Sequence, residues 1–220
     1  MLPTRVPLVY SRAERLSDAA VHVMGVLAAL MAAPVLITLA AVWFGDAGTV
    51  TAAAVYSISL VAMLTCSAIY HLAPLPAWKD FLRRVDQTAI YLKIAGTYTP
   101  FVVMSGTSAG LFLAGLWSAA LTGAAMILFG STRLRWPSLF LYLAIGWAGA
   151  WVGRPLFDAM SPETFWLIVT GGCIYTLGVV FFLWERLPFH NTIWHVFVLT
   201  ATAILYSAVL VEFWGRSAGI

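Results

Sequence analysis

Apolar residues fall into seven long runs along the chain, separated by short segments that contain glycine, proline or serine. A helix that crosses a bilayer needs about 20 mainly apolar residues, and each run approaches or exceeds that length. The segments between the runs, such as 45–48 and 105–110, hold residues that end helices. The runs cover residues 18–43, 48–72, 86–106, 109–130, 137–155, 163–184 and 189–213. This pattern predicts an all-α integral membrane bundle of seven transmembrane helices.

Composition supports the same class. Hydrophobic residues make up 62% of the sequence and charged residues 10%, and the mean hydropathy is +0.92. A soluble domain carries about 25% charged residues, so this chain has too few of them to cover a surface in water. Seven spans and their loops use nearly the whole chain, which predicts a single transmembrane domain over residues 1–220 with a short cytoplasmic tail at residues 1–16.

Basic residues are distributed unevenly between the two sides of this bundle. Nine lie in the N-terminal tail and in the second, fourth and sixth loops, whereas only Arg154 and Arg216 lie on the other side. Because loops rich in lysine and arginine stay in the cytoplasm, we expect a cytoplasmic N-terminus and an external C-terminus in the inner (plasma) membrane. The net charge of +3 is explained by loops that face anionic headgroups, so we expect membrane lipid, and no nucleic acid, as the partner.

The chain contains four histidines, and this topology places all of them near the cytoplasmic ends of helices. One of them ends the second run, four residues after Ser67, so the two side chains share one helical face. Asp86 begins the third run on the same side. Polar groups this close to hydrocarbon are costly and usually mark a functional site. The four histidines are His22, His71, His190 and His195.

These residue types suit a catalytic zinc site, in which three protein ligands leave a fourth position open. Asp86 can hold a water molecule and move its proton, and Ser67 can hydrogen-bond an oxyanion or orient the ligands. Each residue also has a structural interpretation: His22 as an interfacial side chain, Asp86 as a helix N-cap, and Ser67 as a partner of its own helix backbone. The zinc hypothesis rests on their coincidence at one side of the membrane.

Three segments resemble a known family. Residues 67–71 (SAIYH), 86–101 (DQTAIYLKIAGTYTPF) and 194–199 (WHVFVL) resemble the hemolysin III family, the bacterial branch of the progestin and adipoQ receptor (PAQR) superfamily. The resemblance implies a seven-helix bundle with a cytoplasmic N-terminus and a zinc ion near the cytoplasmic face. In that superfamily a second-helix histidine and two seventh-helix histidines bind zinc, and a serine and an aspartate complete the site. The matching residues are His71, His195, Ser67 and Asp86.

The chain departs from this pattern at one position. The superfamily's seventh-helix histidines are four residues apart, but the residue four before His195 is Asn191. His190 is five residues away, about 140° around an ideal helix, and it faces inward only if Pro188 starts the helix and residue 190 lies in an irregular first turn. The expected metal ligands are His71, His195 and His190, with Asn191, His22 or water as alternatives to His190.

The resemblance also implies an activity. Eukaryotic relatives have been linked to ceramidase-like amide hydrolysis, which favours a zinc-dependent hydrolase of a lipid amide or ester with Asp86 and Ser67 as its catalytic residues. One alternative is a non-enzymatic membrane sensor or receptor whose zinc is structural. Another is a pore-forming hemolysin, although the low charge along the spans offers no obvious ion pathway.

Overall fold

The computed structural model describes residues 10–106, 109–130, 135–152, 156 and 158–219. Within these ranges all regular secondary structure is helical. In chain order the elements are α1 (Arg12–Trp43), α2 (Ala47–Leu72), the 3-10 helix η1 (Pro76–Trp78), α3 (Lys79–Met104), α4 (Gly110–Phe129), α5 (Arg135–Gly146), α6 (Ala148–Val152), α8 (Pro162–Leu183) and α9 (His190–Ala218).

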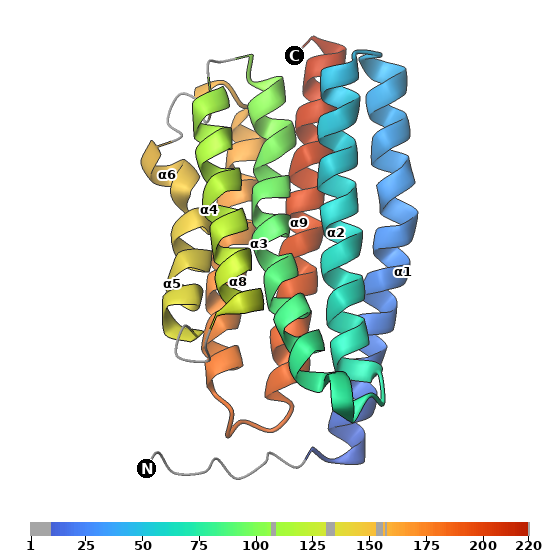
Figure 1. The fold of residues 1–220 in the computed structure, drawn as a ribbon. Helices are drawn as coiled ribbons and strands as arrows, with labels where there is room; N and C mark the ends of the chain where they lie inside the picture. The colour runs from blue at the N-terminus through green and yellow to red at the C-terminus, as the bar shows by residue number, and fades with distance from the viewer. Residues whose placement is uncertain (1–9, 107–108, 131–134, 153–155, 157, 220) are drawn as a thin grey trace.

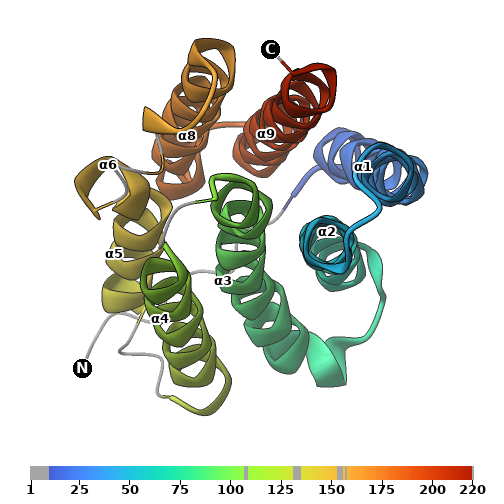
Figure 2. The ribbon, with the colours of Figure 1, turned by 90° about the horizontal axis from the view of Figure 1, so that it is seen from above.

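The long helices lie side by side as a bundle, with the start of α1 and the end of α9 at opposite ends (Figure 1). Viewed from above, α3 lies between α2, α4 and α9 (Figure 2), and it contacts all three of them as well as α5. The α1 helix packs against α2 and α9, so the first and last helices of the described chain are neighbours. This arrangement brings residues from opposite ends of the sequence to one place.

Five helices are long and apolar enough to cross a membrane, namely α1, α2, α4, α8 and α9. The α3 helix has 26 residues, but its first turns contain charged side chains such as Asp80 and Arg84. The fifth run, predicted over residues 137–155, is interrupted because α5 ends at Gly146 and α6 begins at Ala148, and residues 153–155 lie outside the described part. The chain is therefore an all-α membrane bundle, whereas the count of seven spans and the orientation of the termini stay predictions.

The start of α1 is fixed by a reciprocal cap. The Ser11 hydroxyl accepts a hydrogen bond from the Glu14 amide at 3.2 Å, and the Glu14 carboxylate accepts one from the Ser11 amide at 2.8 Å. Such a pair satisfies amides that have no partner within the helix. The second carboxylate oxygen of Glu14 accepts a hydrogen bond from the Phe189 amide at 2.9 Å. This contact joins the beginning of α1 to the turn that precedes α9.

Close helix packing around α3 depends on two glycines. A Cβ atom on Gly96 would lie 2.2 Å from the Ser59 hydroxyl of α2, and one on Gly123 of α4 would lie 2.4 Å from the Tyr91 ring of α3. Small residues at such positions let helix backbones approach closely in membranes.

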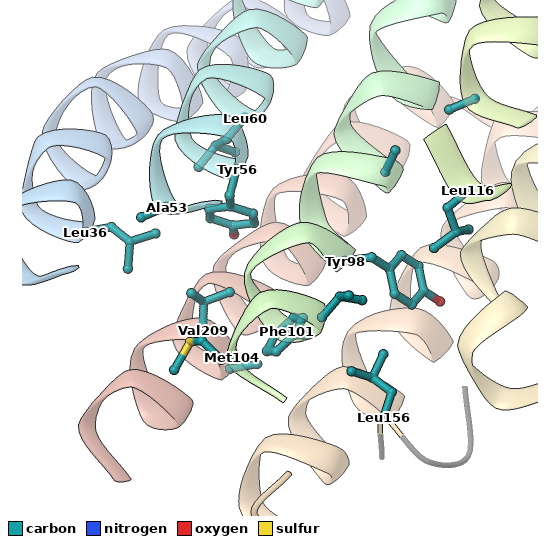
Figure 3. Close-up of a cluster of buried hydrophobic side chains, with 14 of the residues drawn as sticks. Leu36, Ala53, Tyr56, Leu60, Tyr98, Phe101, Met104, Leu116, Leu156 and Val209 are labelled. Atoms are coloured by element: carbon teal, nitrogen blue, oxygen red, sulfur yellow. The ribbon is translucent and has the colours of Figure 1, made fainter. Parts of the chain in front are cut away.

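Apolar side chains occupy both the interior and the exterior of the bundle. Leu36, Tyr56 and Val209, from α1, α2 and α9, belong to one buried cluster (Figure 3). On α4, Leu111 and Phe129 are 88% and 87% exposed. A helix that is hydrophobic on all sides is typical of a membrane span, so the exposed side chains form the surface expected to contact lipid.

Candidate metal centre

One carboxylate and three imidazoles meet at the end of the bundle where α1 and α9 begin and α2 ends. Asp18 and His22 lie four residues apart in α1, which puts them on one face of that helix. The other two imidazoles come from the last turn of α2 and the second turn of α9. One ligand atom from each residue lies within 4.8 Å of the others, a spacing that could hold a metal ion. The four residues are Asp18, His22, His71 and His195.

Asp18 holds all three rings through their Nδ1 atoms. Its carboxylate accepts a hydrogen bond from His195 Nδ1 at 2.6 Å, and its second oxygen lies 3.1 Å from His71 Nδ1. Its backbone carbonyl accepts a hydrogen bond from His22 Nδ1 at 2.8 Å. Because a carbonyl oxygen can only accept, His22 carries its proton on Nδ1. Because the Nδ1 atom of each ring contacts Asp18, the Nε2 atom is the one available to bind a metal ion.

Such an arrangement fits a metal ion. Metal-ligating histidines almost always donate their other ring N–H to a carboxylate or a backbone carbonyl, which fixes the tautomer and the ring orientation. Here the Asp18 carboxylate serves two rings and its carbonyl serves the third. The ring centroids of the three histidines lie 4.2 to 4.8 Å apart. Three such imidazoles match the protein ligand number of a catalytic zinc site.

The cluster is largely removed from solvent. The side chains of Asp18, His22 and His195 are 12%, 4% and 9% exposed, whereas that of His71 is 17% exposed. A carboxylate buried near hydrocarbon is costly unless it is paired. The hydrogen bonds from the imidazoles satisfy the Asp18 carboxylate, so the four residues form one interdependent unit.

Ser67 and Asp86 border this cluster. The Ser67 hydroxyl lies 3.3 Å from His22 Nε2, one helical turn before His71 on α2. Asp86 is a partly exposed residue of α3, and its carboxylate is close enough to interact with Ser67 and His71. The structure therefore brings the two residues singled out as catalytic candidates to one side of the imidazoles.

His190 and Asn191, in contrast, lie outside the cluster. His190 Nε2 lies 3.1 Å from the hydroxyl of Tyr10, and the Asn191 side chain interacts with the same hydroxyl. Burial raises the pKa of Tyr10 above its ordinary value. His190 Nδ1 is buried without a hydrogen-bond partner among the described residues. The histidine that joins His71 and His195 is His22.

Asp18 was not among the residues expected from the sequence. The sequence could nevertheless have identified Asp18. It precedes His22 by four residues, a spacing that puts an acid and an imidazole on one helical face. The residue stood at the predicted beginning of the first span, where a carboxylate is readily explained as part of a helix terminus.

A cavity of about 890 Å³ adjoins the cluster. It is lined by all four candidate ligands and by Ser67 and Asp86, and it continues to apolar and aromatic side chains of α3, α5 and α8. Small-molecule sites are typically cavities of about 300–1,000 Å³ with mostly apolar walls and a few polar groups. Further along the cavity, the lining includes Tyr98, Trp147, Ile168 and Tyr175.

Apolar helices, a buried carboxylate–imidazole cluster and an adjoining cavity define a helical multi-pass membrane protein with a candidate metal site. The chain belongs to the family described as "Haemolysin-III related", whose profile matches residues 11–206. It is accordingly a multi-pass protein of the bacterial plasma membrane.

Curated relatives cover most of the chain. The "Hemolysin-3 homolog" of Bacillus subtilis (strain 168) is 35% identical over 199 residues, 90% of this chain and 93% of the relative. The "Hemolysin-3" of Bacillus cereus is 34% identical over 199 residues, 90% of each chain. The human "Monocyte to macrophage differentiation factor" is 31% identical over 166 residues, 70% of this chain and 67% of the relative. No solved structure matches the chain.

Proposed function

We propose that the chain is a zinc-dependent hydrolase of a membrane lipid amide or ester, with its site near the cytoplasmic face. The observation that carries this proposal is the set of three imidazoles whose Nδ1 atoms all contact Asp18, beside a cavity that is mostly apolar. In this proposal Nε2 atoms of His22, His71 and His195 hold the zinc. Bound zinc would supply Lewis acidity and lower the pKa of a bound water to about 7.

Asp86, Ser67 and Asp18 have separate roles in the proposed hydrolysis. Asp86 accepts a proton from the attacking water and returns it to the leaving amine or alcohol, as a general base and then a general acid. Ser67 donates a hydrogen bond to the substrate carbonyl oxygen as charge develops on it. Asp18 keeps the rings in one tautomer and orientation. The products are a carboxylic acid and an amine or an alcohol.

The cavity favours a lipid as the substrate. Its lining joins the polar cluster to aromatic and aliphatic side chains such as Tyr98, Trp147 and Ile168. Such a wall gives an acyl chain apolar surroundings similar to those it leaves in the bilayer. A lipid that carries its amide or ester bond at the end of an acyl chain would therefore have its polar bond at the metal end and its chain among the apolar residues.

The decisive experiment compares Asp86→Asn with the wild type in lipid nanodiscs. Zinc content is measured by mass spectrometry, and hydrolysis is measured with ceramide and monoacylglycerol substrates. We expect Asp86→Asn to lose at least about 100-fold in rate, the contribution of a general acid–base group, while it keeps its zinc. Asp80→Asn is the matched control, because Asp80 is an acid of the same helix whose side chain is 94% exposed. Equal rates in Asp86→Asn and the wild type would remove Asp86 from the mechanism.

A second candidate function is a membrane sensor with a structural metal. It is favoured by one observation, namely that the cluster joins three helices, α1, α2 and α9. In that case chelation of zinc lowers the thermal stability of the protein, and no lipid is turned over by the metal-loaded form. Turnover that disappears on chelation and returns on zinc addition would select the hydrolase instead.

A further inference from the structure

The α9 helix begins at a strained residue. Its N-cap, Phe189, has a φ angle of 59°, and the phenyl side chain caps none of the helix amides. A left-handed backbone is uncommon and unfavourable for a bulky residue. Among the described residues Phe189 is the only non-glycine residue with a positive φ angle. Such a conformation persists only where neighbouring groups hold it.

The group that holds this turn is a carboxylate of the first helix. Glu14 Oε1 accepts a hydrogen bond from the Phe189 amide at 2.9 Å. Its Oε2 accepts one from the Ser11 amide at 2.8 Å, so the same side chain also completes the cap of α1. Two helices begin here, and the positive end of each helix dipole favours a carboxylate. Glu14 therefore joins the first turn of α1 to the beginning of α9.

Two more polar contacts join α1 to α9 between this turn and the imidazole cluster. Ser17 Oγ lies 2.9 Å from Thr192 Oγ1, and the Asp18 carboxylate accepts a hydrogen bond from His195 Nδ1 at 2.6 Å. Both helices run in the same direction from this end of the bundle (Figure 1). The contacts consequently follow one another in the same order along both helices, and the last of them belongs to the metal centre.

The beginning of α9 determines where the His195 imidazole points. Six residues of an α-helix correspond to about 9 Å, so His195 lies less than two turns after Phe189. Each residue of a helix also adds a rotation of about 100°. If Phe189 left the left-handed conformation, the first turn of α9 would fray or begin at another residue. The imidazole would then lose its fixed direction toward Asp18.

We infer that Glu14 is a positioning residue of the metal centre. By holding Phe189 in the left-handed conformation, it fixes the beginning of α9 and keeps the His195 imidazole against Asp18. The apparent affinity for a metal ion falls in proportion to the fraction of protein in which the site is formed. Glu14 thus controls metal affinity without binding the metal. This inference rests on the metal centre of the proposed function and adds a residue to it from the α1–α9 junction.

The test compares Glu14→Ala and Glu14→Gln with the wild type, as full-length proteins in lipid nanodiscs, by competition for zinc with a chelator. We expect Glu14→Ala to bind zinc about 10-fold more weakly, the lower end of the effect of removing a group that orients metal ligands. Glu14→Gln keeps an oxygen that can accept from the Phe189 amide, so it is expected to retain more affinity than Glu14→Ala. Glu163→Ala, which removes an exposed acid from the first turn of α8, is the matched control and is expected to bind zinc as the wild type does.

Phe189→Gly distinguishes positioning from a general loss of stability. Glycine adopts the left-handed conformation without steric cost, so the turn then needs less support from Glu14. We expect Glu14→Ala to weaken zinc binding less in the Phe189→Gly protein than in the wild type. Equal losses in the two backgrounds would overturn the inference, and so would an unchanged zinc affinity in Glu14→Ala.

A measurement without metal separates this inference from the proposed function. In zinc-free protein labelled with ¹⁵N-histidine, the Nδ1 proton that His195 shares with Asp18 is observed by NMR and assigned by its absence from His195→Gln. We expect this signal to weaken in Glu14→Ala and to persist in Glu14→Gln. An unchanged signal in Glu14→Ala would refute the positioning role whether or not zinc binds. A wild type that shows the expected signals but binds no zinc would refute the hydrolase and support the role of Glu14 in placing His195.

Discussion

Asp18 and His195 are 177 residues apart in the sequence and are joined by a hydrogen bond of 2.6 Å between Oδ1 and Nδ1. The bond connects α1 to α9 and places the second carboxylate oxygen beside the imidazole of His71 in α2. Charge-assisted hydrogen bonds of this length are among the stronger polar contacts in proteins. The carboxylate that organises the cluster thus belongs to the first helix, and the helices it joins come from both ends of the described chain.

Replacing Asp18 by alanine is expected to weaken zinc binding about 10- to 100-fold, the typical effect of removing a partner that orients metal ligands. The three rings would keep their Nε2 atoms but lose the carboxylate that fixes two of them. Zinc affinity is measured by competition with a chelator in detergent solution. Asp80→Ala serves as the control for loss of an acid, because Asp80 lies outside the cluster. Unchanged affinity in Asp18→Ala would show that the rings are held by other contacts.

Two histidines compete for the role of third metal ligand. The sequence analysis expected His190, whereas the structure places His22 beside His71 and His195. His22→Ala is expected to lower zinc to well below one ion per chain, because this ring stacks on His71 and lies edge-on to His195. His190→Ala is expected to retain zinc, since its ring contacts Tyr10 instead. Zinc per chain, determined by mass spectrometry on purified protein, decides between them. The opposite result would return the ligand role to His190.

Gly123 allows α4 to pack closely on α3. Alanine at this position would place its Cβ 2.4 Å from the Tyr91 ring, and such overpacking typically destabilises a protein by about 1–3 kcal/mol. Gly115→Ala is a matched control in the same helix, because a Cβ there has no neighbour within 4 Å among the described residues. Thermal unfolding in detergent should show a lower midpoint for Gly123→Ala and little change for Gly115→Ala. Equal midpoints for both variants would mean that Tyr91 moves aside without cost.

Glu212 stabilises the opposite end of the bundle. It is 3% exposed and accepts a hydrogen bond of 2.7 Å from Arg216 Nε, while the Arg216 guanidinium also donates to the Ala159 carbonyl. We expect Glu212→Gln to lower the free energy of unfolding by about 1–3 kcal/mol, because a partner of a charged group is lost. Glu163→Gln, at an exposed acid in the first turn of α8, is the control. Identical thermal midpoints would indicate that Arg216 alone maintains this end.

The sequence predicted the helical membrane class because hydrophobic periodicity and run length are dictated by the bilayer itself. Boundaries of the apolar runs agree with the helices where turns are marked by residues such as Asp46, the N-cap of α2. The fifth run was harder, because its composition is apolar throughout while the helix is interrupted between Gly146 and Ala148. Hydropathy reports the medium around a segment and carries little information about a local break in its backbone.

The site was predictable only in part, for a similar reason. Spacing within one helix relates Ser67 to His71, and the topology brings both toward Asp86 and His195. Which of the other imidazoles completes the group depends on how α1 packs against α9, a long-range contact that local spacing does not encode. Asp18 could have been singled out by its distance of four residues from His22. Its role as the common partner of three rings required the neighbouring helices.

The convergence of α1, α2 and α9 has a consequence for biosynthesis. A chain emerging from the ribosome delivers Asp18 and His22 to the membrane first and His195 only after the intervening helices have been inserted. A metal ion bound by all three imidazoles would therefore be held only after insertion of α9, and a nascent or truncated product that lacks this helix leaves Asp18 without its contact to His195. Completion of the cluster thus requires α9, which gives membrane quality control a physical difference between chains that contain this helix and fragments that lack it.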